Sequence, residues 1–266
     1  MKIKSEVEML QAEFVNRLIK DTKLYISEID KSYIETIMLS GSVSRGDYFP
    51  GEMGGMIDLI VMKNTRFKVS AQEIFGKNED PDIPFHCVNR NGNWYQIKYI
   101  EYIDLNAFKE LSESAKYALL ESQILFDNNN HFQNELKGIK QLSYCEQLNE
   151  LHKCLVFIKY LLSDYKKDRW IRRGAYIQMH ENLNTSINLA IKCIYYINRM
   201  YCPAEDRQLY YSFELKKKPD KFIDLIVRLK RQDMSSFDDY ERRESIFNNE
   251  LMEYIERNRP TIASSG

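Results

Sequence analysis

Apolar residues alternate with polar ones through the first hundred positions, whereas in the second half they recur at helical spacing. Residues 33–39, 56–62 and 94–103 each predict a short β-strand, because they alternate or form a brief apolar run between turn residues. The Asn-Gly pair before 94–103 predicts a hairpin with 85–89. Residues 5–29 instead carry apolar side chains three and four positions apart, which predicts an amphipathic helix that covers one face of a sheet.

The apolar period changes from about two to about 3.6 near Asn128. Before this point Asp104 is placed to cap a helix. Pro203 is expected to end one of the later helices. The helical segments expected around these residues are 105–120, 132–164, 175–201, 221–229 and 237–255. The sequence thus predicts an α/β (α+β) domain with a mixed sheet over 1–128 and an all-α helical bundle over 129–266.

Composition narrows the class of protein. Lys and Arg total 38 and Asp and Glu total 39, a net charge of −1, so no overall basic field argues for nucleic acid as a partner. Five cysteines without Cys-x-x-Cys spacing argue against a zinc site or a disulfide framework and favour a reducing cytoplasm. No apolar run approaches the ~18 residues that a membrane span needs. We therefore expect a cytoplasmic protein with no membrane partner.

A glycine-rich stretch, GSVSRGDYFPGEMGGMIDLIVM, joins the first two predicted strands. Glycine permits positive φ and lets backbone amides approach a ligand closely, while Ser42 and Arg45 offer donors for phosphate oxygens. Asp58 is a carboxylate in an otherwise apolar strand, a costly position unless it has a partner such as a divalent metal ion. Ordinary turns use the same residue types. In this order, however, they favour a nucleoside triphosphate site.

GSVSRG followed by a hydrophobic-Asp-hydrophobic strand resembles the signature of the DNA polymerase β-like nucleotidyltransferases. That superfamily includes the aminoglycoside and the minimal nucleotidyltransferases. Residues 122–127 (SQILFD) resemble the closing strand of the same fold. The resemblance implies that Gly41 and Ser42 hold the triphosphate of ATP. Arg45 and Gly46 match the Arg-Gly pair that follows. Asp58 matches the second aspartate of an Asp-x-Asp pair that binds Mg²⁺.

The chain departs from the family pattern at the first aspartate, where Met56 stands. One carboxylate is a poor Mg²⁺ site, so Glu52 in the long loop is a candidate second ligand; the alternative is a solvated loop charge. The family's third carboxylate lies on a later strand. Glu101 is the candidate for this third carboxylate, and Gln96 or Lys98 are the alternatives for its position. The plain interpretation is a charge on an edge strand that faces water.

The helical half resembles the substrate-binding domain of the aminoglycoside-type enzymes, and residues 197–219 look like a helix-loop-helix of related bacterial proteins. In those enzymes a carboxylate of the helical domain acts as general base on the substrate hydroxyl. Glu181 is the candidate for that role, and the alternative is a surface glutamate. Arg173 and His180 also resemble the ribonuclease motif of small helical toxins encoded beside minimal nucleotidyltransferases, a spacing that also arises by chance.

These observations predict a Mg²⁺-dependent transferase that moves a nucleoside monophosphate, expected to come from ATP, onto a hydroxyl of a small molecule or a protein held between the domains. The rival prediction is a non-catalytic relative that binds a nucleotide or a partner protein as a regulator. Met56, in place of the first aspartate, is the residue that favours this rival. The sequence leaves open the acceptor, the preferred base and the oligomeric state, a homodimer included.

Overall fold

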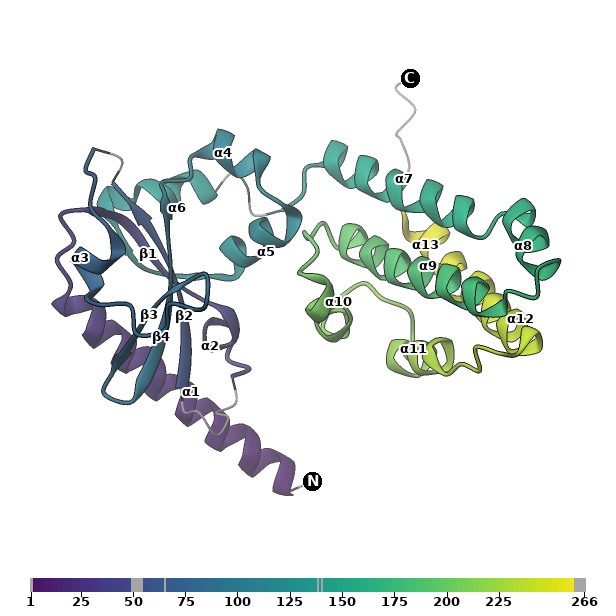
Figure 1. The fold of residues 1–266 in the computed structure, drawn as a ribbon, viewed down its shortest axis with the longest axis horizontal. Coiled ribbons are helices and arrows are strands. Elements are labelled where there is room, and N and C mark those ends of the chain that lie inside the picture. The colour runs from purple at the N-terminus through teal and green to yellow at the C-terminus, as the bar shows by residue number, and fades with distance from the viewer. Residues whose placement is uncertain (1, 49–54, 65, 138, 140, 261–266) are drawn as a thin grey trace. The chain divides into compact units, whose positions relative to one another are not determined.

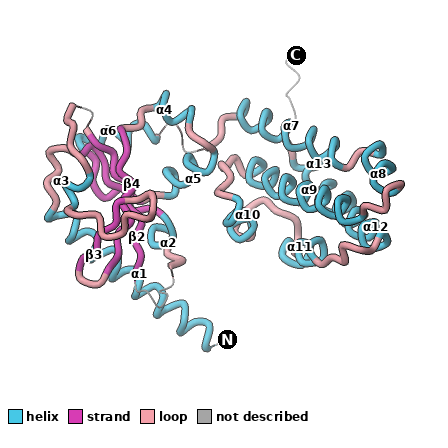
Figure 2. The backbone as a smooth tube through the Cα atoms, viewed as in Figure 1, coloured by secondary structure: helices cyan, strands magenta, loops and turns pink. Residues whose placement is uncertain are grey.

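The computed structural model describes residues 2–48, 55–64, 66–137, 139 and 141–260. The chain divides into two compact units, residues 1–140 and 141–266. Their elements follow one another along the chain as Figure 1 labels them. Figure 2 shows that the described strands belong to the first unit, whereas the second is built of helices and loops. The molecule is therefore a mixed α/β unit followed by a helical one.

The first unit is built on a five-stranded mixed sheet. Its strands are β1 (Ile34–Ser40), β2 (Gly55–Lys63), β3 (His86–Arg90), β4 (Asn93–Glu101) and β5 (Gln123–Asp127), in the order β3-β4-β2-β1-β5. β2 and β4 are parallel, and the other neighbours are antiparallel. The helices are α1 (Lys2–Glu28), α2 (Gly41–Arg45), α3 (Ala71–Phe75), α4 (Leu105–Glu110), α5 (Glu113–Glu121) and α6 (His131–Leu136), with a 3₁₀ turn over Asn128–Asn130. The first four strands lie where the alternation, the apolar run and the Asn-Gly turn predicted them, and β5 lies within the expected 122–127.

One face of the sheet packs against α1, as the apolar stripe of that helix predicted. Leu18 of α1 is buried in the same cluster as Ile37 of β1 and Ile57 of β2. Successive side chains of a strand point to opposite faces. Asp58, next to Ile57, therefore lies on the face away from α1.

The β3–β4 hairpin is closed by the predicted Asn-Gly turn. Asn91 and Gly92 both have positive φ, at 53° and 82°, as a type I′ turn requires. The register pairs Arg90 with Asn93 on either side of the turn. A local sequence signal was enough to locate this hairpin.

The stretch predicted as one helix over 105–120 is interrupted. Asp104 caps α4 as predicted, with its Oδ1 accepting from the backbone amides of Asn106 and Ala107 at 2.9 and 2.8 Å. Leu111 is extended, however, and Ser112 caps the separate helix α5. The break follows from this second cap, whose hydroxyl oxygen accepts from the amide of Ala115 in the first turn of α5 at 3.3 Å.

The run over 132–164 is also divided, into α6, α7 (Tyr144–Leu161) and the start of α8 (Asp164–Ile171). Ser143 and Glu146 form a capping box that begins α7. α6 stays with the sheet, because the Asp127 carboxylate accepts from the amides of Phe132 and Gln133 at 3.2 and 2.8 Å. The first unit therefore extends to 140, beyond the boundary expected at Asn128.

The second unit is a helical assembly around α9 (Tyr176–Ile197). The other helices are α7, α8, α10 (Glu205–Ser212), α11 (Phe222–Lys230), α12 (Phe237–Ile246) and α13 (Glu253–Asn258), with a π-helical segment, η2, over Phe247–Met252. α7, α8, α10, α12 and α13 contact α9, which ends at Ile197, before Pro203. The described residues of 141–260 contain no strand, and no described helix is long and apolar enough to cross a membrane.

Candidate functional site

Gly41 and Asp58 meet where β1 passes into α2. The β1–β2 register pairs Ser40 with Asp58, and Gly41 follows with φ of +69°. A Cβ atom at Gly41 would lie only 2.1 Å from Asp58 Oδ2. Since only glycine lacks that atom, it alone allows this close approach. The structure thus brings the glycine-serine turn and the strand carboxylate together.

The GSVSRG sequence forms a single turn of helix that packs on the core of the first unit. Val43 is buried in the cluster that also contains α1 and the strands. Gly46 ends the turn in the left-handed conformation, with φ of 83°, and the amide of Asp47 donates to the Ser42 carbonyl at 3.1 Å. Ser42, half-buried, therefore sits on an anchored turn beside Gly41.

Arg45 is engaged by carboxylates of its own unit. Its Nε lies 3.5 Å from Asp47 Oδ2 and its Nη1 lies 3.3 Å from Glu121 Oε2. Burial raises the pKa of Glu121, and a hydrogen bond from Tyr117 and the charge of Arg45 offset part of that rise. These ion pairs tie α2 to the end of α5. A phosphate at Arg45 would have to compete with both carboxylates.

The parallel register of β2 and β4 shows what flanks Asp58. Gln96 is the partner of Asp58, and Trp94 is the partner of Met56. Met56 shares the face of Asp58, because two positions separate them on one strand, and it is 43% exposed. The neighbouring positions therefore carry a thioether and an amide, and neither adds a negative charge beside Asp58.

Glu101, the predicted third carboxylate, lies toward the other end of β4 from Asp58. It is paired in register with Lys63 and forms an ion pair with it, with 64% of the Glu101 side chain exposed. Lys63 is five residues beyond Asp58, or about 16 Å along a strand, and an odd offset reverses the face. The structure does not bring Glu101 to Asp58. Gln96, one of the predicted alternatives, is adjacent instead.

The described residues do not complete a Mg²⁺ site. Glu52, the predicted second ligand, lies outside the residues that the structure describes. Within the described ranges, no group of three or more His, Cys, Asp or Glu side chains is placed to hold a metal ion. Mg²⁺ prefers several oxygen ligands in octahedral geometry, and Asp58 alone would contribute one carboxylate to such a set.

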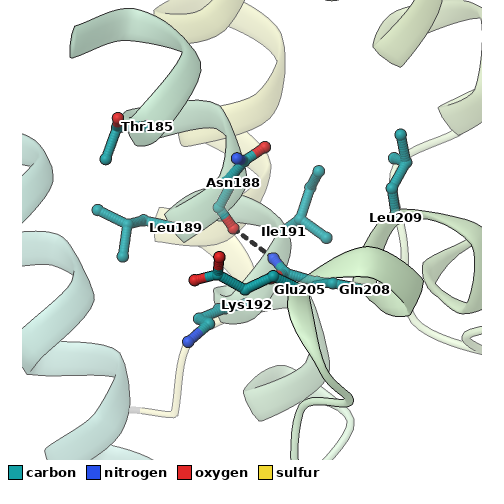
Figure 3. A pocket seen from close by; sticks show the side chains of 8 residues that line it. All are labelled: Thr185, Asn188, Leu189, Ile191, Lys192, Glu205, Gln208 and Leu209. Atoms are coloured by element: carbon teal, nitrogen blue, oxygen red, sulfur yellow. Dashed lines mark hydrogen bonds between the residues drawn. The ribbon is translucent and has the colours of Figure 1, made fainter. Parts of the chain in front are cut away.

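Glu181 lies on α9 in the second unit, where its Oε1 accepts from Asn184 Nδ2 at 3.4 Å. Its side chain is exposed. One turn further on, α9 presents Thr185, Asn188 and Lys192 to a cavity of about 240 Å³ that residues of α10 complete (Figure 3). Helix residues three and four apart share a face, so Glu181 lies on the same stripe of α9 as this polar cavity.

His180 is a buried structural residue, which removes the ribonuclease interpretation. Its Nε2 lies 3.0 Å from the Ser236 carbonyl and its Nδ1 lies 2.6 Å from Arg243 Nη1. A guanidinium only donates, so Nδ1 accepts and Nε2 carries the hydrogen that the carbonyl receives. Arg173 is exposed beside the ring of Trp170. Both ring nitrogens of His180 are thus used inside the bundle.

Arg243 is a buried residue that the sequence analysis missed. It is fully buried, and besides His180 it donates from Nε to the Leu229 carbonyl at 2.7 Å and from Nη2 to Asn184 Oδ1 at 2.5 Å. Burial lowers the pKa of its guanidinium. It stands in the charged run DDYERRES, which gives no signal that one of its arginines is internal.

No protein-family model matches the chain, and no curated protein matches it. Function must therefore be inferred from the residues themselves. Their clearest arrangement is the glycine-serine turn with Asp58 against it.

Proposed function

We propose that the first unit binds a nucleoside triphosphate at the turn formed by Gly41, Ser42 and Asp58, and that the protein is a nucleotidyltransferase. The observation that carries the proposal is the contact of the Asp58 carboxylate with Gly41, which a side chain at Gly41 would prevent. Backbone amides and a hydroxyl beside a strand carboxylate are the groups that phosphoryl-transfer sites use to position a triphosphate.

The proposed reaction transfers a nucleoside monophosphate, with ATP as the expected donor. A hydroxyl oxygen of the acceptor attacks the α-phosphorus, the bond between that phosphorus and the oxygen bridging to the β-phosphate breaks, and pyrophosphate leaves. The hydroxyl proton passes to a general base, for which Glu181 remains the candidate. Asp58 would contact phosphate-bound Mg²⁺, although the described residues do not complete the ligand set of that ion.

The second unit supports the proposal with a polar cavity suited to a hydroxylated acceptor. Asn188, Lys192, Glu205 and Gln208 line it and supply both donors and acceptors of hydrogen bonds. Gln208 Nε2 donates to the Asn188 carbonyl at 2.6 Å, which joins α9 to α10 across the cavity (Figure 3). Both a small molecule and a protein side chain can carry the acceptor hydroxyl. The composition favours a cytoplasmic setting for the reaction.

A second candidate is nucleotide binding without transfer, in a regulatory protein. Met56 and Gln96 favour it, because they flank Asp58 without adding a negative charge. Under this candidate the wild-type protein binds ATP and transfers nothing. Met56→Asp would then rebuild the Asp-x-Asp pair on an exposed position of β2 and raise the affinity for Mg²⁺.

Pyrophosphate release separates the two candidates. The wild-type chain is incubated with ATP, Mg²⁺ and a panel of aminoglycosides, other hydroxylated metabolites and candidate proteins. The transferase predicts release with at least one acceptor, abolished by Asp58→Asn and retained by Glu101→Gln, which serves as the matched carboxylate control. Release that survives Asp58→Asn would refute the site. ATP binding without release across the panel would establish the second candidate instead.

A further inference from the structure

Aromatic rings are exposed where α7 ends and α8 begins, in the part of the second unit that leads on to α9 (Figure 1). Phe157 and Tyr160 of α7 are 46% and 56% exposed, and Tyr165 of α8 is 74% exposed. The Phe157 and Tyr160 rings are stacked, with centroids 6.0 Å apart. Exposed rings that gather in this way are typical of interaction surfaces. They give the second unit an aromatic surface that a partner can reach.

Positively charged groups lie among these rings. Lys166 Nζ lies 3.8 Å from the centre of the Tyr160 ring, so the end of α7 and α8 form one continuous surface. The guanidinium carbons of Arg169 and Arg173 lie 4.9 and 5.4 Å from the centre of the Trp170 ring. A cation over an aromatic face is attracted by the ring quadrupole. Rings and cations are therefore interleaved along α8 and the turn that follows it.

Some cations of this segment are neutralised by carboxylates and others are not. Lys167 forms an ion pair with Glu244, and Arg172 forms one with Asp168. Within the described part of the chain, the cations of this segment that have no carboxylate partner are Lys166, Arg169 and Arg173. Their positive charge is therefore available to an anionic partner. The α7–α8 surface comprises these three cations and the three exposed rings, namely Phe157, Tyr160, Tyr165, Lys166, Arg169 and Arg173.

The α7–α8 surface matches the two parts of a single-stranded polynucleotide. Unpaired bases stack on aromatic rings, while the phosphates between them meet lysine and arginine. A duplex keeps its bases stacked on one another and would leave the rings unused. The overall net charge of −1 does not oppose this match, because salt screens exposed charges beyond about 8 Å. The local cations therefore decide what binds.

Carboxylates on the same helix favour RNA over DNA as the strand. Asp164 and Asp168 are exposed on α8, one turn apart. A carboxylate repels phosphates, but it accepts a hydrogen bond from a ribose 2′-hydroxyl, which deoxyribose lacks. An RNA strand can thus offset the repulsion that a DNA strand would only suffer.

We propose that the α7–α8 surface binds single-stranded RNA. Bases stack on Tyr165 and on the paired rings of α7, and phosphates lie against the three cations. Every base has a face that can stack on an aromatic ring, so binding tolerates many sequences. All the residues involved belong to the second unit. The proposal is therefore independent of the nucleotide site in the first unit.

Fluorescence anisotropy of a labelled oligo(U) of about 12 nucleotides, a length that single-strand binding surfaces cover, tests the proposal on the full chain. Binding should be saturable, and its logarithm should fall with the logarithm of salt concentration with a slope of about −2, the value for three phosphate contacts on a single strand. Oligo(dU) of the same length should bind at least about twofold more weakly, because it lacks the 2′-hydroxyl.

Three results would overturn the proposal. The first is no saturable binding of oligo(U). The second is oligo(dU) or an RNA duplex of the same length that binds as tightly as oligo(U). The third is a higher affinity for vesicles of phosphatidylserine than for oligo(U), which would make a membrane surface the partner.

Matched variants localise the binding. Tyr165→Ala should weaken oligo(U) binding at least about fivefold, the loss expected for one stacked base, whereas Tyr210→Ala, 64% exposed on α10, should leave it unchanged. Arg169→Gln combined with Arg173→Gln should reduce the salt slope from about −2 to about −0.7. Arg207→Gln, an exposed arginine of α10, is the control for the charge. Equal effects of the variants and their controls would refute the assigned surface.

Trp170 gives an independent readout of the same surface. In a Trp94→Phe chain it is the remaining tryptophan, and the guanidinium groups of Arg169 and Arg173 lie against its ring. Phosphates that engage those groups should change its fluorescence over the same range of oligo(U) concentration as the anisotropy. Binding that leaves Trp170 fluorescence unchanged would place the RNA elsewhere on the chain and refute the proposal.

Discussion

Replacing Gly41 by alanine should destabilise the first unit through two separable effects. The φ of +69° at Gly41 costs an L-residue about 1–2 kcal/mol. The added methyl group would also lie 2.1 Å from Asp58 Oδ2 and 3.1 Å from its Cγ, well inside van der Waals contact, and overpacking of this kind costs about 1–3 kcal/mol. Together, the two effects predict a loss of about 2–5 kcal/mol of unfolding free energy.

Gly46→Ala is the matched control. Gly46 has φ of +83°, but a Cβ atom there would meet nothing within 4 Å, so this variant should lose only the backbone contribution of about 1–2 kcal/mol. In an Asp58→Ala background the steric part of Gly41→Ala should also largely disappear. The coupling energy of that double-mutant cycle is expected to be about 1–3 kcal/mol.

Urea unfolding followed by tryptophan fluorescence can isolate the first unit. The chain has two tryptophans, Trp94 on β4 and Trp170 on α8, so Trp170→Phe leaves Trp94 as the reporter of the first unit. A Gly41→Ala loss no larger than that of Gly46→Ala would refute the reasoning. So would a Gly41→Ala loss that Asp58→Ala does not reduce.

Three further predictions follow from individual contacts. His180→Phe should lower the unfolding free energy of the second unit by about 1–3 kcal/mol, because Arg243 Nη1 loses its acceptor. Urea unfolding followed by Trp170 fluorescence in a Trp94→Phe chain measures this loss, and an unchanged midpoint would contradict the prediction. Because burial raises the pKa of Glu121, its charged form opposes folding, so Glu121→Gln should be more stable than wild type at neutral pH. That difference should vanish as the pH falls below about 4.3, the pKa of an unfolded glutamate, and a pH-independent difference in urea midpoints would argue against it. Glu101→Gln should leave ATP affinity unchanged in calorimetry, since Glu101 pairs with Lys63 away from Asp58; a weakened affinity would return Glu101 to the site.

Local signals located most elements of the fold. The alternation of the strands, the Asn91-Gly92 turn and the Asp104 cap each act over a few residues, and the structure contains each of them. The helix breaks had local signals as well. Ser143 and Glu146 form a capping-box pattern that the helical periodicity on either side concealed.

The candidate site depends on long-range pairing, which the sequence shows only in part. The family-like order of residues suggested that Gly41 and Asp58 cooperate, and the β1–β2 register does place them together. Which residue of β4 lies beside Asp58 depends on a parallel pairing without a local signal, so Gln96 could not be distinguished from Glu101. The burial of Arg243 likewise arises from contacts between distant segments.

Titration of ATP with Mg²⁺ against the Trp170→Phe chain tests the proposed nucleotide site most directly. Trp94 reports binding there, because it is the register partner of Met56 on the edge of the site. We predict a saturable change of Trp94 fluorescence in the otherwise wild-type chain, and at least about tenfold weaker binding of the Mg²⁺–nucleotide after Asp58→Asn, the loss expected when a carboxylate that contacts the nucleotide-bound Mg²⁺ is neutralised. No saturable change, or an Asp58→Asn chain that binds as tightly as its parent, would contradict the account.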